Sequence, residues 1–107
     1  MSDPLNPYVW GPGWWRTLHT AALALTDVGA FLRLLQTLPR TLPLPEARRL
    51  AAEFLSRAPP QFFVRDAASA SQYTFNMHNY VNVALGKPVA DPAAYYASYG
   101  VHVLPTW

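Results

Sequence analysis

The sequence contains no cysteine among its 107 residues. Disulfide bonds, thiolate catalysis and cysteine-based metal sites are therefore excluded, and the usual indicator of a redox compartment is missing. Charged residues are also scarce, at 13% of the chain against 51% for hydrophobic residues. So few charges on a small domain suggest that a cofactor, a second subunit or a larger assembly covers part of the surface.

Long apolar runs and clusters of charge are absent as well. No stretch reaches the roughly 18 apolar residues that a transmembrane helix needs, so we expect no membrane span. The eight lysines and arginines are spread along the chain, which leaves no basic patch for nucleic acid. The N-terminal stretch MSDPLNPYVWGPG lacks a basic segment followed by an apolar core, so a secretory signal is not expected.

What the sequence does contain is a series of helical patterns separated by proline and glycine. We expect one domain of the all-α class, a four-helix bundle with a short fifth helix. The early prolines and glycines predict an extended N-terminal arm over residues 1–12, before a bundle over 13–99 and a C-terminal tail over 100–107. The predicted helices cover residues 14–26, 28–38, 45–58, 65–86 and 93–99.

Local signals mark several ends of these helices. Pro45 suits a first helical turn, where its missing N–H is not needed. Gly86 is typical of a helix stop in the left-handed conformation. Asp91 followed by Pro92 predicts an N-cap and the first turn of the short fifth helix.

Polar side chains interrupt two otherwise apolar helices. The stretch HNYVNVALGKP places His78 and Asn82 on one face of the fourth helix and Asn79 at its margin. In the first helix Trp15 and His19 are four residues apart, so they project from the same side. Each buried polar group without a partner costs about 1 to 3 kcal/mol, so these groups need an explanation.

Several interpretations fit these polar groups. In one, His19 and His78 are core histidines bonded to backbone carbonyls, and the asparagines act near a helix end. In another, they and Lys87 surround a planar ligand that is rich in hydrogen-bonding groups and carries phosphates. A metal site would need more ligands than two histidines beside asparagines, and the third histidine, His102, lies in the tail, so we expect no metal.

Two segments resemble the signature segments of a known family. GPGWWRTLHT near the start and HNYVNVALGK in the fourth helix are similar to those of the Erv/ALR sulfhydryl oxidases. These are small FAD-binding helical bundles that make disulfides and pass electrons to oxygen or cytochrome c. The resemblance covers roughly residues 10–99 and implies FAD as a cofactor and a homodimer packed through the first helices. It implies that the FAD is surrounded by Trp15, His19, His78, Asn79, Asn82 and Lys87, with Tyr73 where the family usually has a tryptophan.

The chain departs from the family pattern at every redox cysteine. The family's Cys-x-x-Cys at the start of the third helix aligns with Leu44 and Ala47, and a second pair, which joins the fourth helix to the fifth, aligns with Phe75 and Pro92. Losing a disulfide costs a small domain about 2 to 5 kcal/mol. Burial of Phe75 could offset about 1.5 to 3 kcal/mol of this loss.

The resemblance and its departures together predict a pseudo-oxidase. Neither Leu44 nor a neighbouring hydroxyl can replace the thiolate that reduces the flavin, so the expected role is binding or scaffolding with FAD as a structural ligand. Large DNA viruses encode small members of this family, so a virus particle is one expected location and the cytoplasm the other. Two alternatives stay open: a flavoenzyme with a non-thiol electron donor, in which His19 or His78 handles a proton, and a bundle that has lost FAD.

Overall fold

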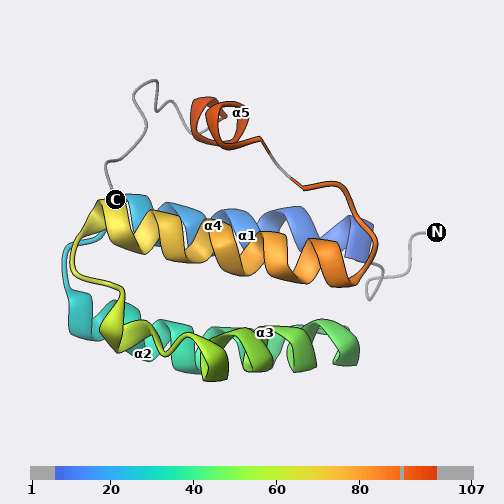
Figure 1. Ribbon diagram of the computed structural model, residues 1–107, viewed down its shortest axis with the longest axis horizontal. Helices are drawn as coiled ribbons and strands as arrows, with labels where there is room; N and C mark the ends of the chain where they lie inside the picture. The colour runs from blue at the N-terminus through green and yellow to red at the C-terminus, as the bar shows by residue number, and fades with distance from the viewer. Residues whose placement is uncertain (1–6, 90, 99–107) are drawn as a thin grey trace.

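The computed structural model describes residues 7–89 and 91–98, and its regular elements in this part of the chain are all helical. Helices α1 and α4 lie side by side in one layer, α2 and α3 form the other, and α5 lies on the outer side of the first layer (Figure 1). The all-α prediction of a four-helix bundle with a short fifth helix is confirmed. The helices are α1 Pro7–Leu23, α2 Val28–Thr37, α3 Pro45–Arg57, α4 Ala67–Ala84 and α5 Pro92–Ala97, with 3-10 turns η1 Leu38–Thr41 and η2 Pro60–Phe62.

The beginning of α1 differs from the prediction. The helix already begins at Pro7 and contains Pro12, so the extended arm predicted for residues 1–12 is wrong for 7–12, while residues 1–6 lie outside the described part. Pro7 fits the first turn, and Pro12 removes only one internal N–H bond. Trp10 and Trp14 pack against the core, which stabilises this turn in a way that the proline and glycine pattern does not reveal.

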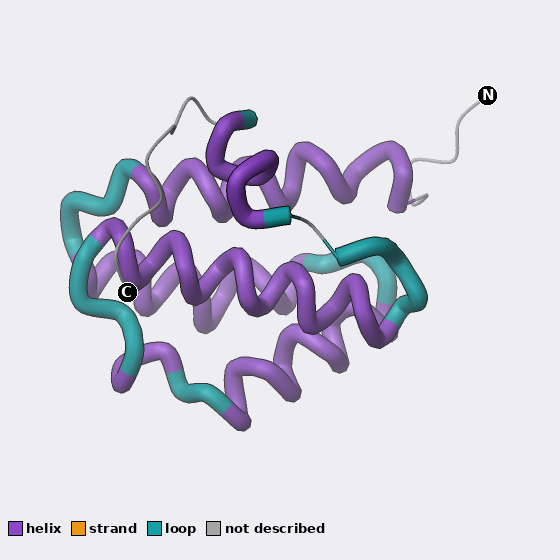
Figure 2. Tube along the Cα trace, turned by 45° about the horizontal axis from the view of Figure 1, so that its top comes forward, coloured by secondary structure: helices purple, strands orange, loops and turns teal. Residues whose placement is uncertain are grey.

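The other helix ends lie within three residues of the predicted ones. Asp66 caps α4 in a reciprocal capping box with Ser69, and the Asp91 carboxylate accepts the backbone N–H of Ala94 at the start of α5. Gly86 has φ +73° after the end of α4, the left-handed conformation that only glycine adopts without strain. The chain therefore turns sharply there (Figure 2), which brings the residues after Gly86 back over the end of α4.

The core lies between the two layers. Leu18 of α1, Leu35 of α2, Ala51 of α3 and Met77 of α4 are completely buried, so each of the four long helices contributes an apolar face. Within the described residues, no helix combines the length and the apolar character that a membrane crossing requires. The predicted tail over 100–107 falls outside the described part of the chain.

Candidate functional site

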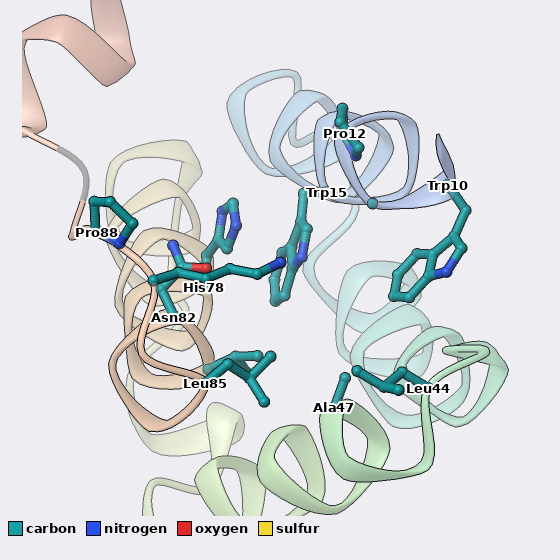
Figure 3. Close-up of a pocket in the computed structure, with 12 residues that line it drawn as sticks. Trp10, Pro12, Trp15, Leu44, Ala47, His78, Asn82, Leu85 and Pro88 are labelled. Atoms are coloured by element: carbon teal, nitrogen blue, oxygen red, sulfur yellow. The ribbon is translucent and has the colours of Figure 1, made fainter. Parts of the chain in front are cut away.

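A cavity of about 460 Å³ opens between α1, the start of α3 and the end of α4 (Figure 3). Three segments that are distant in the sequence supply its walls, so only the folded chain creates it. Four of the residues predicted from the sequence line it: Trp15, His78, Asn82 and Lys87. Trp10, Leu44, Ala47, Leu85 and Pro88 are further lining residues.

One wall of the cavity is a stack of flat rings. The indole of Trp15 and the imidazole of His78 lie 3.9 Å apart between centroids and are tilted by only 6°. Trp14 packs edge-on against Trp15 at 4.9 Å, and Trp15 itself is only 8% exposed. Because the rings fix one another, this wall is a rigid platform for a planar ligand.

His19 lies directly behind this wall and is only 2% exposed. Its Nε2 is 3.0 Å from Nδ1 of His78, and its Nδ1 is 3.1 Å from the hydroxyl oxygen of Thr74. Burial, together with the proximity of His78, lowers the pKa of His19 to about 3. Burial and the positive charge of Lys87 lower the pKa of His78 to about 4. Both rings are therefore neutral at pH 7.

Asn82 and Lys87 supply the polar rim of the cavity. The backbone N–H of Lys87 donates to the carbonyl of Asn82 at 2.8 Å, and that of Gly86 donates to Val83. This pattern is the Schellman ending of a helix, and it returns the chain so that both side chains line the same cavity. The rim thus combines one neutral amide with one cation.

Two residues implied by the family resemblance lie elsewhere. The Tyr73 hydroxyl donates to the carbonyl of Ala58 at 2.6 Å, and its ring packs edge-on against Phe54. Asn79 lines a separate groove with Tyr80 and Val83. The structure therefore brings together Trp15, His78, Asn82 and Lys87, with His19 behind them, and does not place Tyr73 or Asn79 on the cavity wall.

Sequence reasoning missed two contributors to the site. Trp10 lines the cavity, but it belongs to the segment predicted to be extended. Thr74 bonds His19 and lies four residues before His78, a spacing that puts both on one face of α4. The four-residue spacing could have identified Thr74 from the sequence. No sequence signal could have identified Trp10, because its segment was predicted to be an extended arm.

The residues aligned with the family's cysteine pairs lie in two different environments. Leu44 and Ala47 point into the cavity from the start of α3 (Figure 3). Phe75 is 7% exposed on α4, and its ring contacts Tyr95 and Tyr96 of α5, with centroid distances of 4.7 and 6.2 Å. The predicted burial of Phe75 is confirmed, and it occurs at the contact between α4 and α5.

Comparison with known proteins finds the same family that the two sequence segments resemble. The model of the Erv1 / Alr family matches residues 12–99. A protein of Invertebrate iridescent virus 3, named as a predicted FAD-linked sulfhydryl oxidase, is 30% identical over 103 residues, which cover 91% of this chain and 70% of the relative. The FAD-linked sulfhydryl oxidase of African swine fever virus, isolate Tick/Malawi/Lil 20-1/1983, is 27% identical over 103 residues, covering 91% of this chain and 85% of the relative.

Proposed function

Because the chain belongs to the Erv1/Alr family, we propose that it binds FAD in the cavity between α1, α3 and α4 as a pseudo-oxidase. One observation carries this proposal. Leu44 and Ala47, aligned with the family's reactive cysteines, line the same cavity as Trp15, His78 and Lys87. The cavity thus keeps groups that suit a flavin nucleotide and has lost the groups that would react with it.

The residues of the cavity suit the flat rings and the phosphate charge of a flavin nucleotide. Its volume of about 460 Å³ lies within the range of about 300 to 1,000 Å³ that is usual for ligand pockets. The stacked wall of Trp15 suits a planar ring, Asn82 offers both a donor and an acceptor, and Lys87 suits a pyrophosphate. Among the described residues that line the cavity there is no carboxylate that would repel phosphate.

The reaction of the family cannot be supported by Leu44 and Ala47. When bound, FAD supplies an isoalloxazine ring that accepts electrons from a thiolate in the family's oxidases. The isobutyl and methyl side chains of Leu44 and Ala47 have no lone pair to donate, so they can offer the ligand only van der Waals contact. FAD would therefore act as a structural ligand that fills and stabilises the bundle.

We also propose a scaffolding role in a protein assembly within a virus particle, with the homodimer packed through α1 that the family resemblance implies as its basic unit. The viral origin of its relatives supports the location. The low charge fraction of 13% and the exposed side chains of Phe62, Val83 and Val89 support the assembly, because such apolar groups favour protein contacts.

The visible absorption spectrum of the purified protein tests this function. We expect a flavin spectrum, either as purified or after FAD is added and unbound FAD is removed. With flavin bound, dithiothreitol and a reduced thiol protein should not drive oxygen consumption above the rate of free FAD. Absence of any flavin binding would contradict the FAD assignment, and thiol-dependent turnover would contradict the pseudo-oxidase assignment.

A further inference from the structure

A chain of hydrogen bonds runs from the backbone of α4 through two buried side chains to the cavity wall. The Thr74 hydroxyl is 3.1 Å from the carbonyl oxygen of Ser71 and 3.1 Å from Nδ1 of His19. Nε2 of His19 is 3.0 Å from Nδ1 of His78. Thr74 is completely buried and does not line the cavity, so any effect it has on a ligand must pass through the two histidines.

The number of O–H and N–H hydrogens in these side chains determines which atom donates in each hydrogen bond. A threonine hydroxyl has one hydrogen, and each neutral imidazole has one N–H. If Thr74 donates to Ser71, it accepts from Nδ1–H of His19, and Nε2 of His19 then accepts from Nδ1–H of His78. All three hydrogen bonds are made in this arrangement. If Thr74 instead donates to His19, the bond to Ser71 is lost and only two remain, so the first arrangement is favoured.

The surroundings of the two rings keep both of them neutral. The indole of Trp15 stacks on His78, the ring of Tyr95 from α5 packs edge-on against His19 at 4.7 Å, and Lys87 adds positive charge near His78. None of these neighbours is a carboxylate that would stabilise an imidazolium. The lowered pKa values of both histidines agree with this arrangement.

We propose that Thr74 is a positioning residue that fixes the His78 proton on Nδ1, so that His78 presents Nε2 to the cavity as a hydrogen-bond acceptor. Within residues 7–89 and 91–98, no side chain or backbone group bonds this Nε2, and the His78 ring lines the cavity. The group that binds there must therefore be a neutral donor, such as a hydroxyl, an amino group or a ring N–H. An ionised phosphate has no such donor, so we expect it to bind Lys87 instead of His78.

This inference rests on the proposed function only for the identity of the ligand. FAD carries sugar hydroxyls, an adenine amino group and a flavin ring N–H, any of which could donate to the lone pair of His78. The protonation pattern itself is a property of the protein without ligand. It can therefore be measured whether or not FAD binds.

Nitrogen-15 NMR of the full chain with labelled histidine tests the protonation pattern at pH 7. We expect the proton on Nδ1 in both His19 and His78, the form that free histidine in water disfavours, with His102→Gln identifying the third signal. Thr74→Val removes the hydroxyl at nearly the same volume, so both rings should move their proton to Nε2. Thr74→Ser keeps the hydroxyl and should keep the wild-type pattern. Wild-type rings protonated on Nε2, or no change in Thr74→Val, would overturn the proposal.

The affinity for FAD provides a second readout. Thr74→Val should weaken FAD binding about threefold to tenfold, because Nε2–H of His78 would oppose a donor of the ligand, and Thr74→Ser should bind within about twofold of wild type. If the wild-type protein binds no FAD but shows the predicted tautomers, the proposed function fails and this inference stands. Equal FAD affinity in both variants would contradict the role of Thr74 in ligand binding. If Thr74→Val does not fold, the protonation pattern of His19 and His78 in the wild-type protein alone tests the proposal.

Discussion

The two regions that align with the family's cysteine pairs differ in what stands in place of the cysteines. Leu44 and Ala47 line the cavity together with Trp15 and His78. At the contact between α4 and α5, the ring of Phe75 packs against Tyr95 and Tyr96. A cross-link can be replaced by packing, since both stabilise the same contact, whereas a reactive thiolate has no apolar equivalent. The chain thus keeps the helical fold of the family, while no cysteine stands at either pair of positions.

The largest expected effect is the return of an activity at the cavity. The double substitution Leu44→Cys and Ala47→Cys restores a Cys-x-x-Cys at the start of α3, where a helix N-terminus favours a thiolate. We expect FAD-dependent oxygen consumption with dithiothreitol to rise from background to measurable turnover. The serine pair at the same positions is the matched control, with polar groups of similar size and no thiolate. Equal rates for the two variants would contradict the assignment of these positions to the lost redox pair.

The next effect concerns the packing of α5. Phe75→Ala should lower the free energy of unfolding by about 3 to 5 kcal/mol, because it removes a buried ring that contacts two tyrosines. Phe62→Ala is the control, since Phe62 is 74% exposed and such a substitution usually changes stability by less than about 0.5 kcal/mol. Urea unfolding of both variants provides the measurement. Equal losses would show that the aromatic contact with α5 has not taken over the role of a cross-link.

The stability of the protein should depend on pH through the two buried histidines beside the cavity. The pKa values of His19 and His78 are lowered to about 3 and about 4, so below pH 6.5 the unfolded chain binds more protons than the folded one. Stability should fall as the pH drops from 6.5 towards 4, by up to about 1.4 kcal/mol per pH unit for each histidine. Urea midpoints should be nearly constant from pH 7 to 8. A flat profile from pH 7 down to pH 4 would contradict the neutral histidine pair.

The smallest effect is expected at the rim of the cavity. Lys87→Ala should weaken FAD binding by about 1 kcal/mol, or about fivefold, because one charge-assisted contact with phosphate is lost at an exposed position. Arg65→Ala, which removes an exposed cation that does not line this cavity, should leave the affinity unchanged. Titration of each variant with FAD by calorimetry compares them. A similar loss in both would indicate a general effect of net charge.

Particular residues show how far sequence reasoning reached. The ends at Gly86 and Asp91 were predictable because caps and left-handed turns depend on a few neighbouring residues. The grouping of Trp15, His78, Asn82 and Lys87 was predicted through the family resemblance, and the structure places all four on one cavity. The beginning of α1 was not predictable, because packing of Trp10 and Trp14 against distant helices outweighs the local preference of prolines and glycines.

The sequence by itself determined the helical class, most helix ends and the absence of every redox cysteine, because periodicity, capping and composition are local properties. Only the tertiary structure decided which polar groups meet. The bond between His19 and His78 joins residues 59 positions apart, and that between His19 and Thr74 joins residues 55 apart. Such contacts depend on how α1 and α4 pack, and in this protein that packing places His78 on the cavity wall with His19 bonded directly behind it.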